Sequence, residues 1–294
     1  MVSAVLVHGV SAALLAGVAD FLAALVARRL GSFLTLLYMI AGSAFLLLAV
    51  QVGLSREPLP AASDVLLMFA VAAAGLAGYL AFYRGLALGP VAVVSPIAAC
   101  DGAVAALIGM AFIGESLGPV QIGAVLLLVV GVALAATDLA AFRKGLKESA
   151  KGPLLAVVTM VGFGIALAGV GAVARRGQSF LMPILILRCF IFVQLAVTAG
   201  ATRRRLLPGV GVGIVLAAAA IGVLDTASLL AFARGMLAEE GGTVSLLGPL
   251  YGAYPVVTVL LSLLVLREKL VANQWLGIVL VLLGTVVLAA CKGA

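Results

Sequence analysis

The sequence predicts an all-α integral membrane protein with ten transmembrane helices, arranged as two inverted five-helix repeats. Hydrophobic residues make up 65% of the chain and charged residues 10%, whereas soluble proteins have roughly 25% charged residues. A chain with so few charges needs lipid rather than water as its solvent. It also contains ten apolar runs, each close to the roughly 20 residues that span a bilayer. These runs lie at about 5–27, 34–53, 64–86, 92–113, 119–137, 153–174, 180–200, 210–233, 243–265 and 271–290.

An internal repeat relates the first five runs to the last five. The segment AFYRG at 81–85 recurs as AFARG at 231–235, and ARRLGSF at 27–33 recurs as ARRGQSF at 174–180. Each copy holds an odd number of runs, so the second copy enters the membrane in the opposite orientation. Such inverted repeats are typical of secondary transporters, whose substrate site lies near the bilayer midplane between the halves. We therefore expect a first repeat at 1–138, a basic linker at 139–152 and a second repeat at 153–294.

Polar residues interrupt the apolar runs of the first repeat. Asp20 lies deep in the first run, and an aspartate at that depth costs a few kcal/mol unless it is paired or functional. Tyr79 and Tyr83 in the third run are four residues apart, so they share one helix face. They fit either the lining of a cavity or a belt of aromatic residues at the membrane interface.

Prolines at equivalent positions interrupt the fourth and ninth runs. Pro96 is followed by Asp101, and its counterpart is Pro249 in the second repeat. A proline inside a helix frees backbone carbonyls, which membranes tolerate only against protein or a wet cavity. The pair predicts kinked helices that move around a central site, although a packing kink without a function is the alternative. Glu115 and Glu268 follow these runs, and each is expected to cap the helix that comes next.

The second repeat contributes a buried cation and further polar groups. Arg188 lies well inside the seventh run, so it should face the protein interior and meet a carboxylate. Its candidate partners are Asp20, Asp101 and Asp225. The ninth run contains GPLYGAYP, which is the best candidate for a broken helix beside the site and holds Pro249, Tyr251, Tyr254 and Pro255.

Several classes of function are disfavoured by what the sequence contains. The net charge of +7 is carried by segments between the runs, where basic residues orient a membrane protein rather than bind nucleic acid. Cys100, Cys189 and Cys291 are isolated, so they predict neither a disulfide framework nor a metal site. No HExxH or GxSxG motif occurs. We expect no enzyme activity, no metal and no cofactor.

Taken together, the ten runs, the paired prolines and the paired glutamates resemble the EamA family of the drug/metabolite transporter superfamily. The resemblance covers residues 5–290 and rests on small residues, Pro and Glu rather than on a catalytic signature. It implies a multi-pass carrier of the bacterial inner membrane that works by alternating access. Members export amino acids and related metabolites or move drugs, often with coupling to protons.

Our functional prediction is a secondary active transporter that exports amino acids or related amine-bearing metabolites in exchange for protons. The small-molecule substrate and the protons would bind at Asp20, Tyr79, Tyr83, Asp101, Arg188, Asp225, Tyr251 and Tyr254, with Pro96, Pro249 and Pro255 as kinks or gates. The ammonium group would meet an aspartate and the carboxylate would meet Arg188. The alternative is an exporter of cationic drugs or polyamines, in which Arg188 only pairs with an aspartate. A monomer in the lipid bilayer would suffice, because fused repeats can enclose a site.

Overall fold

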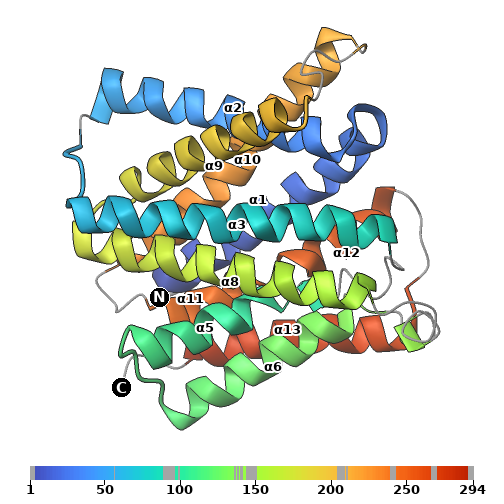
Figure 1. Cartoon of the computed structure of the whole chain (residues 1–294). Coiled ribbons are helices and arrows are strands. Elements are labelled where there is room, and N and C mark those ends of the chain that lie inside the picture. Colours follow the sequence, from blue (N-terminus) through green and yellow to red (C-terminus); the bar gives the residue numbers. More distant parts are fainter. Residues whose placement is uncertain are drawn as a thin grey trace.

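The part of the chain described by the computed structural model consists of helices and their connections, with no strands (Figure 1). The described residues are 4–55, 57–88, 97–98, 100–135, 137, 139, 142–143, 151–203, 209, 211–238, 243–265 and 270–290. Pro96 and Glu268 lie outside them, as does the side chain of Tyr83. Predictions about these three groups therefore remain predictions.

Each apolar run predicted from the sequence contains a described helix. The first half holds α1 (Ala4–Leu30), α2 (Ser32–Val50), the π-helical turn η1 (Gln51–Ser55), α3 (Ala62–Leu88), α5 (Asp101–Phe112) and α6 (Pro119–Ala135). The second half holds α8 (Lys151–Gly177), α9 (Met182–Ala201), α10 (Val212–Met236), α11 (Val244–Tyr251), α12 (Tyr254–Val265) and α13 (Ala272–Ala290). Six of these helices, α1, α2, α3, α8, α9 and α10, are long and apolar enough to cross a membrane.

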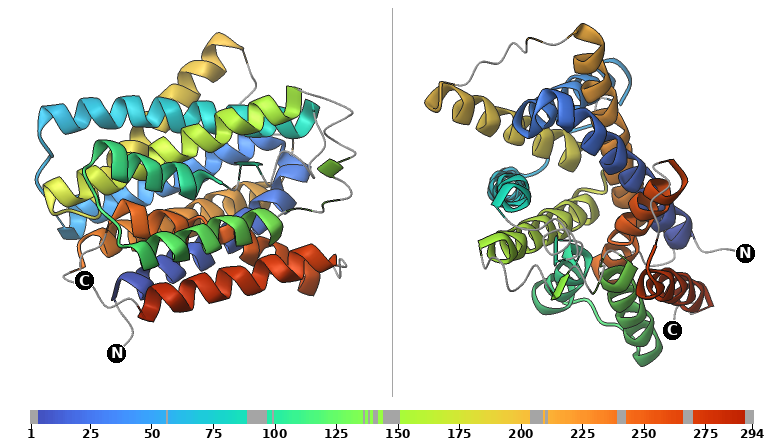
Figure 2. Two further views of the ribbon diagram at one scale, coloured as in Figure 1. Left: turned by 90° about the horizontal axis from the view of Figure 1, so that it is seen from below. Right: turned by 90° about the vertical axis from the view of Figure 1, so that its right-hand side faces the viewer.

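The two halves of the chain interlock instead of forming separate bundles. The most extensive helix contacts join α3 to α8, α6 to α13 and α1 to α10, and every one of these pairs takes one helix from each half. Figure 2 shows α6 and α13 side by side in both views. We call the face at which α1 begins, α8 ends and α13 ends the terminal face; it lies on the left in Figure 1.

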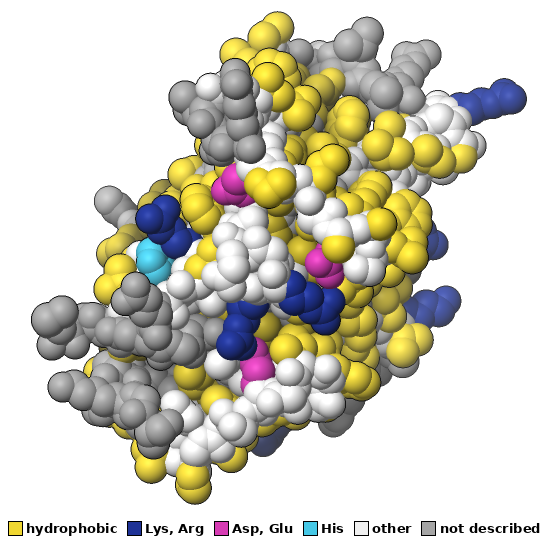
Figure 3. Space-filling model, turned by 90° about the vertical axis from the view of Figure 1, so that its left-hand side faces the viewer, with side chains coloured by type: hydrophobic (Ala, Val, Ile, Leu, Met, Phe, Trp, Pro, Cys, Tyr) yellow, Lys and Arg dark blue, Asp and Glu magenta, His cyan; other side chains and the backbone are white. Residues whose placement is uncertain are grey.

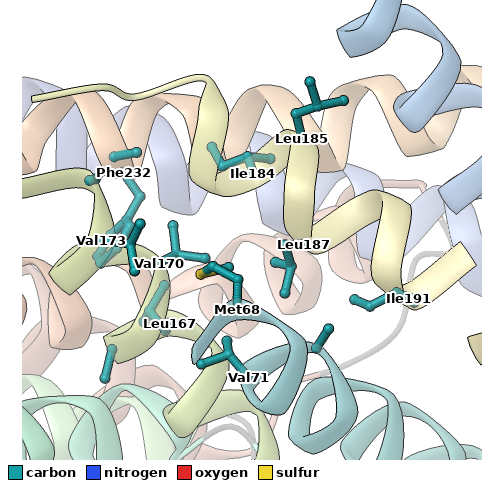
Figure 4. Close-up of a cluster of buried hydrophobic side chains, with 14 of the residues drawn as sticks. Met68, Val71, Leu167, Val170, Val173, Ile184, Leu185, Leu187, Ile191 and Phe232 are labelled. Carbon is teal, nitrogen blue, oxygen red and sulfur yellow. The ribbon is translucent and has the colours of Figure 1, made fainter. Parts of the chain in front are cut away.

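A buried apolar core fills the bundle toward the terminal face. Figure 4 shows its side chains converging from four helices: Met68 and Val71 of α3, Leu167, Val170 and Val173 of α8, Ile184, Leu185, Leu187 and Ile191 of α9, and Phe232 of α10. All of them are buried. Val244 and Leu247 of α11 belong to the same core, so the start of α11 is packed against α8 and α10.

The expectation that Glu115 caps the next helix is wrong. The first turn of α6 is served by Gln121, whose Oε1 accepts the N–H of Gly118 at 2.9 Å. The repeat-related Gln274 does the same for Val271 at the start of α13, at 3.0 Å. The Glu115 carboxylate instead accepts the N–H groups of Val244 and Ser245 at the start of α11. It caps a helix of the other half because the end of α5 and the start of α11 meet at the terminal face.

Packing between α2 and α10 depends on a glycine. A Cβ atom at Gly222 would lie 1.9 Å from the carbonyl oxygen of Met39, so Gly222→Ala must push the two helices apart. We expect it to lower the free energy of unfolding by about 1–3 kcal/mol, measured by thermal unfolding in detergent micelles. Gly123→Ala is the matched control, since no atom of the described residues lies within 4 Å of its Cβ position. Equal unfolding temperatures for the two variants would contradict this account of the packing.

Candidate functional site

A cavity that is open to solvent lies between the two halves of the chain, and its empty space, with the solvent at its mouth included, is about 690 Å³. Its lining comes from α1, α3, α5, α8, α9, α10, α11 and the first residue of α12. The apolar core at Val170 and Leu167 forms the wall nearest the terminal face.

The cavity brings together the predicted polar site residues whose side chains are described. These are Asp20, Tyr79, Asp101, Arg188, Asp225, Tyr251 and Tyr254. They come from seven different helices and from both halves of the chain. Because Tyr79 lies in the cavity with the other site residues, it fits the lining of a cavity better than a belt of aromatic residues at the membrane interface.

Arg188 of α9 is held by Asp225 of α10. The Nη2 atom of Arg188 donates to Oδ2 of Asp225, and the arginine side chain is only 1% exposed. Of the three candidate aspartates, Asp225 is therefore the partner. The Nε atom of Arg188 is buried and has no hydrogen-bond partner among the described residues. The pair neutralises its own charges and leaves one donor unused.

Asp20 and Asp101 have no such counter-cation among the described residues. Neither forms an ion pair with any described residue. Asp101 is the first residue of α5, and its Oδ1 accepts the N–H of Gly102 at 2.8 Å. Asp20 is exposed and lines the cavity. Since Asp225 is already paired, these two carboxylates give the cavity an excess of negative charge when they are ionised.

Aromatic rings complete the lining. Tyr79 contacts Phe163 edge to face, with 4.7 Å between the ring centroids. The ring centroids of Tyr251 and Tyr254 are 5.9 Å apart. Phe163 was not predicted, because it lies in a glycine-rich run with no charged residue to mark it. Such rings can bind a cation through their faces. The cavity therefore pairs carboxylates with aromatic surfaces.

The ninth apolar run is broken at the cavity. Helix α11 ends at Tyr251 and α12 begins at Tyr254, with Gly252 and Ala253 between them. Pro249 lies inside α11 and Pro255 in the first turn of α12. The interruption lets Tyr251 and Tyr254 both reach the cavity. The backbone at the break stays hydrogen-bonded, since the Gly252 N–H donates to the Gly248 carbonyl at 2.8 Å, as burial in a membrane requires.

Comparison with known proteins places the chain in a family. The model of the EamA-like transporter family matches it twice, at residues 3–137 and 150–290. A crystal structure of a protein with 21% sequence identity superposes with a TM-score of 0.73 and covers 98% of this chain and 97% of its own. That likeness shows a shared fold. No curated protein matches the chain in sequence. The two family matches together span nearly all of the sequence, and the chain is a multi-pass membrane protein of the EamA-like transporter family.

Proposed function

We propose that this protein is a secondary transporter that exports amine-bearing solutes across the bacterial inner membrane in exchange for protons. The observation that carries the proposal is the pair Asp20 and Asp101, which line the cavity without a counter-cation among the described residues. A carboxylate in a low-dielectric site requires either a proton or a cation. An amine and a proton would therefore compete for the same groups, and this competition couples their fluxes.

The pairing of Arg188 bears on the class of solute. Arg188 already has Asp225 as its counter-ion, so it does not require a carboxylate group on the substrate. This favours amines as such, including polyamines and cationic drugs, over compounds that require a carboxylate. Amino acids are the second candidate, supported by Arg188, which lines the cavity and whose buried Nε–H has no hydrogen-bond partner among the described residues. Tyr79, Phe163, Tyr251 and Tyr254 would hold the organic part of either solute.

The arrangement of the helices supports alternating access by an inverted repeat of five plus five spans. In Figure 1, α1 runs from the terminal face toward the opposite face, whereas α8, its counterpart in the second half, runs the other way. Both halves line the same cavity. Rocking one half against the other would expose the cavity to each side in turn. One chain supplies the whole lining, so a monomer suffices.

The class of solute is tested with compounds that differ only in a carboxylate. The purified protein in liposomes, under a pH gradient, is given the pairs tyramine and tyrosine, and agmatine and arginine. Proton flux is followed with a pH-sensitive dye, and liposomes without protein give the passive background. We expect the amines to evoke at least as much flux as the amino acids. Flux with the amino acids alone would reject the amine class and favour capture of the carboxylate by Arg188.

A further inference from the structure

Glu115 joins the two halves of the chain at the terminal face. Its Oε1 atom accepts the Val244 N–H at 2.9 Å, and its Oε2 atom accepts the Ser245 N–H at 2.8 Å and the Ser245 hydroxyl at 2.7 Å. Arg175, near the end of α8, adds an ion pair at 3.3 Å. The carboxylate side chain is 3% exposed. One side chain from the loop after α5 thus fixes the first turn of α11 and the last turn of α8.

Helix α11 connects this carboxylate to the cavity. Its first residue, Val244, is bound by Glu115, and its last residue, Tyr251, lines the cavity. The side chains of Val244 and Leu247 are buried in the core that lies between the cavity and the terminal face. A tilt of α11 away from α8 would remove these side chains from the core. The cavity would then open toward the terminal face.

The structure also provides a pivot for such a tilt. The regular helix ends at Tyr251 and resumes at Tyr254, and between them the chain forms a turn in which the Ala253 N–H donates to the Leu250 carbonyl at 3.3 Å. Beside this break, α5 and α11 touch through their backbones, because a Cβ atom at Gly102 would lie 2.6 Å from the Gly248 carbonyl oxygen and 3.1 Å from the Gly252 Cα atom. This close backbone contact fixes the cavity end of α11. At the other end of the helix, the polar contacts are those to Glu115 and a contact between the Ser245 hydroxyl and the Ala106 carbonyl oxygen of α5 at 3.2 Å.

We infer that Glu115 is a releasable clamp that keeps the cavity closed toward the terminal face. Breaking its hydrogen bonds to Val244 and Ser245 frees α11 to tilt about Gly252–Ala253. The inference rests on the proposed alternating access, since only a transporter needs this opening. The helix N-terminus stabilises the clamp further, because its first N–H groups carry a partial positive charge.

A second ion pair on the same face offers a matched control. Arg176 pairs with Asp64 at 3.1 Å and joins α8 to α3, and in the described part of the chain neither side chain bonds to α11. Figure 3 looks onto this face, where basic and acidic side chains lie next to one another. Removing Asp64 changes the charge of the face by the same amount as removing Glu115. It leaves the start of α11 untouched.

The clamp is tested by labelling a cysteine placed behind the core. Cys100, Cys189 and Cys291 are replaced by alanine, and Val170→Cys is added as a reporter, because Val170 is buried and lines the cavity. A membrane-impermeant maleimide is applied in liposomes to the side on which a C-terminal tag is accessible. Glu115→Ala should raise the labelling rate at least about tenfold, given the loss of several charge-assisted hydrogen bonds. Asp64→Ala should change it by less than about twofold.

Two milder variants keep the test decisive if Glu115→Ala does not fold. Glu115→Gln retains an acceptor for the α11 N–H groups, and Arg175→Ala removes only the ion pair, so both should show smaller increases than Glu115→Ala. Labelling unchanged from the parent in every folded variant would overturn the clamp. The readout needs no substrate. Increased labelling without amine-driven proton flux would therefore reject the proposed function and support the clamp. Amine-driven proton flux with unchanged labelling would support the proposed function and reject the clamp.

Discussion

Arg188→Leu is expected to lower the free energy of unfolding by about 3–5 kcal/mol, because it leaves the Asp225 carboxylate buried without a counter-charge. The double variant Arg188→Leu/Asp225→Leu should recover most of this loss, since two apolar side chains replace both members of the pair. Thermal unfolding in detergent micelles measures both effects. Neither variant is expected to transport amines normally, because both residues line the cavity.

The control for this prediction is an ion pair at the surface. Arg176→Leu removes an arginine side chain that is 60% exposed and pairs with Asp64, so it should cost less than about 1 kcal/mol. A double-mutant cycle over Arg188 and Asp225 isolates the interaction itself. Additive single effects would show that the two side chains do not stabilise each other and would remove the reason for treating Arg188 as already neutralised.

Most of the helical framework could be predicted because lipid imposes a simple rule on sequence. A spanning segment must be apolar and about 20 residues long, so the ten runs and their repeat are visible without any contact information. The break between Tyr251 and Tyr254 was also suggested by the local sequence, since proline and glycine cluster there. What the sequence lacked was the pairing of helices across the halves, such as α3 with α8.

The polar residues of the site could be predicted from the sequence, whereas its apolar residues could not. Asp20, Asp101, Arg188 and Asp225 stand out because a charge inside an apolar run is costly. Phe163 could not be distinguished from any other apolar residue of α8, although it lines the cavity. The partner of Arg188 and the true role of Glu115 depend on contacts between segments far apart in the chain. The wrong prediction for Glu115 came from assuming that a carboxylate serves the nearest helix in sequence.

Asp20→Asn and Asp101→Asn are expected to abolish most amine binding. Each substitution keeps the size of the side chain and removes the charge that faces the cavity. Loss of one partner of a desolvated ion pair costs about 2–5 kcal/mol, which corresponds to roughly 30-fold or more in affinity. Binding of radiolabelled agmatine to the purified protein measures this. Asp64→Asn, on the terminal face and outside the cavity lining, is the matched control and should bind like the parent protein.

The affinity for amines should depend on pH, because an amine and a proton compete for the same carboxylates. If a proton and an amine share Asp20 and Asp101, amine affinity must fall as the pH is lowered, because protonated carboxylates no longer attract a cation. Each asparagine variant should weaken this dependence, and the double variant Asp20→Asn/Asp101→Asn should lose it. An affinity that stays constant across the acidic range would argue that the amine binds elsewhere.

Proton release on binding tests the central claim most directly, because it measures the exchange at the site without a membrane. Agmatine is added to the purified protein in weakly buffered detergent solution, and a pH indicator reports the protons released. We predict that release approaches one proton per bound amine near the lowest pH at which the amine still binds, and that the double variant Asp20→Asn/Asp101→Asn releases none. Amine binding without any proton release, or release that persists in the double variant, would contradict the proposal that these two carboxylates exchange a proton for an amine.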